Sequence, residues 1–112
     1  MELLRDAESI VHETLPELFQ EAGLGDYAAG LRSAPAMISF EAAIAVCELL
    51  QGIRVNAGEA RPAEWCEIVE ELAFWGEGAV WAAADGEIDL FNDCLMMVKR
   101  VAAVSWAKFA TH

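Results

Sequence analysis

The chain has 112 residues, and its 19 Asp and Glu against seven Lys and Arg give a formal net charge of −12. This charge repels polyanions, so direct binding to nucleic acid or to an anionic membrane surface is disfavoured. Because 56% of the residues are hydrophobic, we expect a single helical domain over residues 1–112 whose core needs neither disulfides nor a metal.

Cysteine usage and the N-terminal segment bear on the compartment. Cys47, Cys66 and Cys94 are far apart in sequence and form no CxxC pair, so we expect reduced, inert core thiols rather than disulfides or a zinc site. The segment MELLRDAESIVHET has acids where a secretory signal has basic residues, and no apolar run reaches the roughly 18 residues of a membrane span. A cytoplasmic protein is predicted. The abundance of alanine, together with five Arg against two Lys, suggests a GC-rich bacterial genome or that of a phage.

Helical periodicity dominates the chain, and no useful stretch alternates with period two. A first helix is predicted over residues 2–13. In the following Thr14-Leu15-Pro16-Glu17, Thr14 suits a helix cap, Glu17 completes a capping box, and Pro16 suits a first turn. The helix should therefore kink or restart there and stop at Gly23, before a short helical turn over residues 26–31.

The next predicted helix has two candidate caps, Ser33 and Ser39, and carries apolar residues from position 40 to position 50. Glu41 and Glu48 are its only charged residues between positions 40 and 51. This low charge predicts the most buried helix of the protein. It should end near residue 52 or residues 56–58.

Two long helices are predicted in the remaining sequence. One spans residues 62–84 and ends at Asp85-Gly86. The other spans residues 88–110 with a continuous apolar stripe that includes Leu90 and Cys94. Short connections favour antiparallel neighbours. The predicted fold is therefore all-α, a compact antiparallel bundle of four to five helices.

Negative charge is concentrated in residues 59–93, which hold ten acids against Arg61. At 100° per residue, six residues of the 62–84 helix share one side and are predicted to face the core: Trp65, Ile68, Val69, Leu72, Trp75 and Ala79. Four acids fall on the opposite side: Glu67, Glu70, Glu71 and Glu77. Phe74 and Trp81, two turns apart, project among these acids.

Large aromatic side chains among acids suit a binding surface, because aromatic anchors supply interface energy while rim charges steer the approach. The predicted partner-binding residues lie on this helix and in the turn after it: Glu67, Glu70, Glu71, Phe74, Glu77, Trp81, Asp85 and Glu87. The alternative is that Phe74 and Trp81 pack beneath another helix and that the acidity serves only solubility.

No stretch carries a catalytic, nucleotide-binding or metal-binding signature. His12 and His112 are the only histidines, and neither follows a glutamate by three residues, as a carboxylate-bridged di-iron bundle requires. Cys66 adjoins Glu67, which opposes thiolate formation. We therefore expect no enzymatic activity, no cofactor and no metal. A small helical enzyme or metal-binding bundle is the least favoured alternative.

In size, acidity and expected helicity, the chain resembles small proteins of phages and bacteria that occupy a basic surface on a larger machine. These are anti-CRISPR proteins and other DNA mimics, toxin-neutralising immunity proteins, and antitoxins. The resemblance involves no shared motif. It implies an inhibitor or neutraliser whose partner is a basic protein surface, either of a nucleic-acid-binding complex or of a toxin. The alternative is a regulatory or assembly subunit that acts as a helical homodimer.

Overall fold

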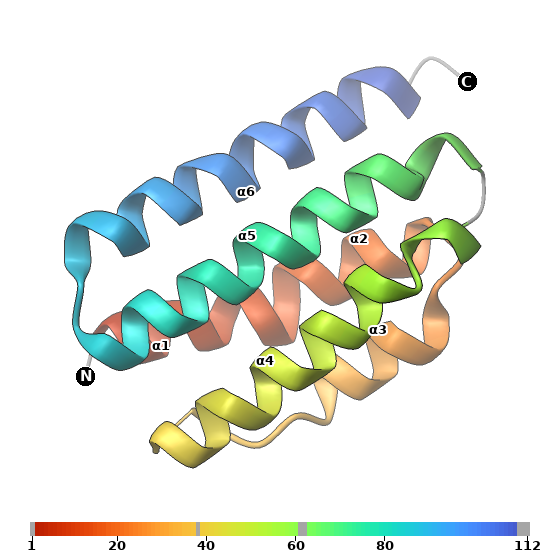
Figure 1. Cartoon of the computed structure of the whole chain (residues 1–112). Coiled ribbons are helices and arrows are strands. Elements are labelled where there is room, and N and C mark those ends of the chain that lie inside the picture. Colours follow the sequence, from red (N-terminus) through yellow and green to blue (C-terminus); the bar gives the residue numbers. More distant parts are fainter. Residues whose placement is uncertain (1, 38, 61–62, 110–112) are drawn as a thin grey trace.

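The computed structural model describes residues 2–37, 39–60 and 63–109, and within these ranges it is helical with no strand. Figure 1 shows an all-α bundle whose consecutive long helices run antiparallel. This confirms the predicted fold class. The α-helices are α1 Glu2–Ser9, α2 Leu15–Glu21, α3 Gly25–Arg32, α4 Phe40–Val55, α5 Cys66–Asp85 and α6 Ile88–Phe109. None of those helices has the length and apolarity to cross a bilayer.

Helix α5 is the centre of the bundle. It packs between α4 and α6, while α1 and α2 pass behind it, and α3 packs against α2 and α4 (Figure 1). Nine residues of α5 are buried: Ile68, Val69, Leu72, Ala73, Gly76, Ala79, Val80, Ala82 and Ala83. The core of the molecule is therefore built around α5.

The prediction that the helix beginning at Phe40 is the most buried one is wrong. Helix α4 buries five residues, fewer than α5, and leaves Phe40 52% and Leu49 37% exposed. The reason is its position at the edge of the bundle, where a low charge does not imply coverage by other helices. In α5, by contrast, the exposed Glu67, Glu70 and Glu71 share one side, and the other three sides meet neighbouring helices.

The chain passes from α1 to α2 through one π-helical turn, Ile10–Thr14, instead of restarting at a cap. Thr14 has helical backbone angles and forms no side-chain cap, so the predicted cap is wrong. The Leu15 N–H donates to the Ile10 carbonyl, five residues earlier. Pro16 has no N–H to donate and its ring crowds the preceding turn, which the wider π turn accommodates.

Several predicted helix ends are confirmed. Helix α2 ends at Glu21 ahead of Gly23, whose φ is 83°, and α5 ends at Asp85 with Gly86 in the left-handed conformation. Ser39 caps α4, because its Oγ accepts a hydrogen bond from the Ala42 N–H at 3.1 Å. A 3₁₀ turn, Ala63–Trp65, precedes α5. The start predicted at residue 62 for the helix now labelled α5 lies outside the described residues, and so does the end predicted at residue 110 for α6.

Two glycines set how closely the neighbouring helices approach α5. A Cβ atom on Gly76 would lie 2.8 Å from Leu15 Cδ1 and 3.7 Å from Leu50 Cδ1. A Cβ atom on Gly78 would lie 3.0 Å from Cys94 Sγ. The missing side chains therefore let α2 and α6 pack close to α5.

Gly76→Leu should lower the free energy of unfolding by about 3 kcal/mol, because the new side chain has to displace Leu15 and Leu50 in a filled core. The matched control is Gly52→Ala in α4, where a Cβ atom meets nothing within 4 Å. That change should stabilise the protein by about 1 kcal/mol through helix propensity. Urea denaturation measures both, and a Gly76→Leu protein as stable as the wild type would contradict the packing described.

Candidate functional site

The side of α5 that points away from α1 and α2 is called the open face here, and it comprises Glu67, Glu70, Glu71, Phe74 and Trp81. The three glutamates are exposed, and so is Phe74, while Trp81 is partly buried. The face is flanked by α4 and α6. The sequence correctly predicted the outward direction of these acids.

Two adjoining hollows occupy the open face. The acidic hollow has a volume of about 410 Å³ and is lined by Arg54, Glu67, Glu70, Glu71, Phe74 and Trp75. The apolar hollow has a volume of about 300 Å³ and is lined by Arg54, Phe74, Trp75, Glu77, Gly78, Trp81, Leu90 and Cys94. Three residues line both hollows: Arg54, Phe74 and Trp75.

Phe74 and Trp81 differ in their surroundings. Phe74 is 49% exposed and meets Trp75 edge-on, with the ring centroids 5.0 Å apart. Trp81 is partly buried and meets Phe40 of α4, with the ring centroids 5.6 Å apart. The expectation of an outward aromatic therefore holds for Phe74, whereas a neighbouring helix partly covers Trp81. Trp75, predicted for the core, is only partly buried.

Arg54 of α4 lies at the boundary between the two hollows. Its guanidinium carbon is 5.8 Å from the centre of the Phe74 ring, and one of its nitrogens is 3.6 Å from Glu77 Oε2. A cation over an aromatic face is attracted by the ring quadrupole. Arg54 therefore places one positive charge in the middle of the open face.

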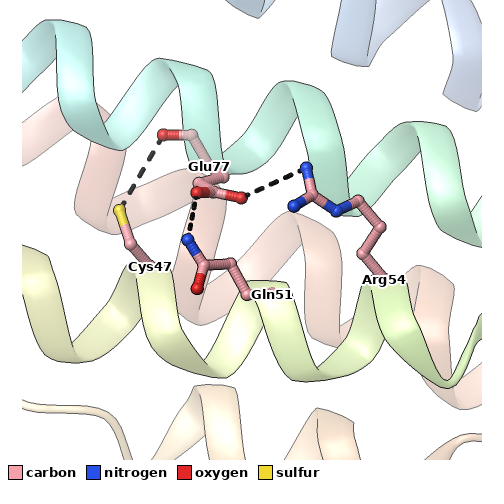
Figure 2. A network of polar contacts seen from close by, with 4 residues as sticks. All are labelled: Cys47, Gln51, Arg54 and Glu77. Atoms are coloured by element: carbon pink, nitrogen blue, oxygen red, sulfur yellow. Dashed lines mark hydrogen bonds and ion pairs between the residues drawn. The ribbon is translucent and has the colours of Figure 1, made fainter.

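Glu77 belongs to the contact between α4 and α5, not to the exposed acids. Gln51 Nε2 donates to Glu77 Oε1 at 2.7 Å, and Cys47 Sγ donates to the Glu77 carbonyl at 3.9 Å (Figure 2). The Glu77 side chain is only 13% exposed, and its Oε2 has no hydrogen-bond partner among the described residues. Its predicted position among the outward acids is therefore corrected, because α4 covers that flank of α5.

Asp85 and Glu87 are exposed at the far end of α5. Asp85 follows Glu71 by about four helical turns, which corresponds to roughly 21 Å at 1.5 Å per residue. Glu87 lines a separate hollow around the turn into α6. The structure therefore does not bring these two acids together with Glu67, Glu70 and Glu71.

Sequence reasoning missed the flanking residues of the open face: Phe40, Arg54, Gly78, Leu90 and Cys94. All except Gly78 come from α4 and α6. A helical wheel drawn for α5 alone does not include the residues of α4 and α6. Leu90 and Cys94 carried a signal only as members of the apolar stripe of α6, which predicted burial, and Leu90 is in fact 47% exposed.

The cysteines are free, and their environments oppose thiolate formation at two positions. Burial, with the nearby Glu77 charge, raises the pKa of the Cys47 thiol to about 12. Burial and the Asp93 charge also raise the pKa of Cys94. Cys66 is only half-buried, so the expectation of a core thiol holds for Cys47 and Cys94 but is wrong for Cys66. Within the described part of the chain, no group of three or more His, Cys, Asp and Glu side chains is placed to hold a metal ion.

At pH 8 without denaturant, a thiol reagent should label Cys66 first and Cys47 last, because Cys47 is buried and its raised pKa leaves little thiolate. Cys66→Ser should remove the fast phase of labelling. The reaction is followed by absorbance and the labelled sites by mass spectrometry. Rapid labelling of Cys47 in the Cys66→Ser protein would contradict this order.

Trp81→Ala should lower the free energy of unfolding by about 2 kcal/mol or more, because it removes a partly buried indole and its contact with Phe40. Phe74→Ala, a change of similar chemistry at a half-exposed ring, should cost less than about 1 kcal/mol. Urea denaturation of the two variants makes the comparison. Equal losses would mean that the two aromatic rings are equally buried in solution.

The chain has no match among the models of known protein families, the curated proteins or the solved structures. Its function is therefore inferred from the open face itself.

Proposed function

We propose that the protein is a non-enzymatic, acidic protein-binding module that occupies a basic surface on a larger protein through the open face of α5. The observation that carries this proposal is the acidic hollow, where three exposed glutamates lie beside the half-exposed ring of Phe74 and outnumber the cation of the lining, Arg54. Carboxylates form strong hydrogen bonds with Lys and Arg, and an aromatic face attracts their cationic groups. The acids outnumber Arg54 in the lining of the hollow, so the hollow favours a cationic side chain of a partner.

A basic partner fits this face better than a second copy of the chain. A symmetric dimer whose two-fold axis passes through the acidic hollow would bring Glu67, Glu70 and Glu71 of both copies together. Like charges facing each other across an interface cost several kcal/mol, and each copy carries a net charge of −12. The charge also disfavours nucleic acid as the direct partner. The homodimer therefore remains the weaker alternative for this surface.

Basic surfaces of proteins commonly hold nucleic acid through Lys and Arg contacts to phosphate. A module that occupies such residues acts as an inhibitor, in the manner of anti-CRISPR proteins and DNA mimics, or as a neutraliser of a toxin, in the manner of immunity proteins. The proposed partner is accordingly a nucleic-acid-binding complex or a toxin. The free cysteines suit a reducing compartment, so the proposal places this activity in the cytoplasm.

The packing of α5 supports a binding role for its remaining side. Helices on three sides hold α5 in place, so its outward side chains extend from a fixed backbone. A preorganised surface loses little conformational freedom on binding. Binding energy is then available for the contacts themselves.

Glu67→Lys, Glu70→Lys and Glu71→Lys together should slow association with the partner about tenfold or more at low salt, and should flatten the salt dependence. The partner is first isolated by affinity capture and mass spectrometry, and the association rates are then measured over a range of salt concentrations. The fold should remain intact because the three side chains are exposed. Circular dichroism checks this point.

The matched control makes the same change of net charge on the N-terminal segment, at Glu13, Glu17 and Glu21, all of which are exposed. Equal effects of the two triple variants would mean that net charge alone drives association. An effect of the control only would move the site to the acidic N-terminal segment. Either result would reject the open face as the binding site.

A further inference from the structure

The apolar hollow adds a second recognition element beside the acidic one. Phe74 and Leu90 on its rim are 49% and 47% exposed, and the neighbouring Phe40, which packs on Trp81, is 52% exposed. Gly78 and Cys94 also line this hollow, and Gly78 contributes no side chain to it. Large apolar groups gathered at one hollow of a small protein are typical of a binding surface.

The two hollows form one continuous surface, because Arg54, Phe74 and Trp75 line both. Along α5, the glutamates of the acidic hollow precede Gly78 and Trp81 by about ten residues, or roughly 15 Å at 1.5 Å per residue. This distance corresponds to about three turns of a partner helix lying along α5. One partner element can therefore occupy both hollows.

The helical surroundings favour a helix over an extended peptide as that element. An extended segment needs partners for its backbone N–H and C=O groups, and sheet edges normally supply them. No strand occurs in the described ranges, so they offer no such edge. A helix satisfies its backbone groups internally and presents side chains to a groove at three- and four-residue steps.

We infer that the open face binds a basic amphipathic helix of the partner, with an apolar side chain in the apolar hollow and Lys or Arg in the acidic hollow. This inference rests on the proposed function and specifies its partner. Charge complementarity selects a basic helix, because Glu67, Glu70 and Glu71 line one end of the surface. The bound helix would lie over α5, between α4 and α6.

Arg54 gives this surface a direction. Its positive charge lies between the two hollows, where it is paired with Glu77 and lies over Phe74. Because Arg54 already pairs with Glu77, this midpoint attracts a cationic side chain of the partner less than the three glutamates do. The apolar residues of the partner helix are then placed against Trp81 and Leu90. The arrangement therefore fixes the orientation of the bound helix as well as its charge.

The test uses two synthetic peptides of about 18 residues, or five helical turns, with identical Leu and Lys composition. In one peptide the leucines follow helical spacing, and in the other the order is scrambled so that no apolar face forms. The patterned peptide should bind at least tenfold more tightly by fluorescence anisotropy. Its binding should shift the indole N–H resonances of Trp75 and Trp81 and leave that of the buried Trp65 unchanged.

Leu90→Gln should weaken binding of the patterned peptide about fivefold or more, and should leave binding of an oligolysine of equal charge unchanged. The matched control is Met96→Gln, which changes an exposed apolar residue on the same helix that lines neither hollow. Both changes preserve the net charge. Circular dichroism confirms that both variants fold.

Equal affinity for the patterned and scrambled peptides, or equal effects of Leu90→Gln and Met96→Gln, would overturn the amphipathic-helix inference. The proposed function survives that result if the triple charge reversal at Glu67, Glu70 and Glu71 still weakens binding of the isolated partner. If the triple reversal changes binding of neither the partner nor the patterned peptide, both the proposed function and the inference are wrong.

Discussion

The close packing of helices around α5 is the constraint on which the rest of the structure depends. Gly76 faces Leu15 and Leu50 without a side chain, and Gly78 leaves room for the Cys94 sulfur. Neighbouring helices therefore approach α5 from three sides, and the exposed Glu67, Glu70, Glu71 and Phe74 lie on the fourth. Both the acidic hollow and the apolar hollow are consequences of this arrangement, because each lies along the one uncovered side of the helix.

Helical periodicity and the glycine signals were sufficient to predict the fold. Gly23 and Gly86 adopt the positive φ angles that end α2 and α5, as the sequence indicated. The π turn was not predictable from a capping pattern, because Thr14-Leu15-Pro16-Glu17 is compatible both with a restart and with a widened turn. The structure has the widened turn, and the residues that follow it at the start of α2, Leu15 and Pro16, are buried. The choice between a restarted helix and a π turn depends on contacts with other helices, which a four-residue motif does not contain.

The sequence predicted which side chains of α5 point outward, but it did not predict which residues of the neighbouring helices lie beside them. A helical wheel places Phe74, Glu67 and Glu70 outward from the geometry of one helix, and the structure agrees. The same wheel fails for Glu77, whose partners Gln51 and Arg54 belong to a different helix. The low charge of α4 wrongly predicted that it is the most buried helix. A helix at the edge of a bundle can expose apolar groups such as Phe40.

The distribution of charge on α5 narrows the kind of recognition that the open face favours. A phosphate mimic needs negative charges at regular spacing along its length, since each strand of a DNA duplex carries one charge per roughly 3.4 Å. Here the exposed acids of the open face are gathered in the first turns of α5, and the remaining surface presents Phe74, Trp81 and the flanking Leu90. Such a surface suits a cationic side chain of a partner at one end and apolar side chains of that partner at the other. Under the proposed function, the protein would therefore resemble a DNA mimic in the basic surface that it occupies, but it would contact that surface through aromatic anchors beside a charged rim and not through a row of phosphate substitutes.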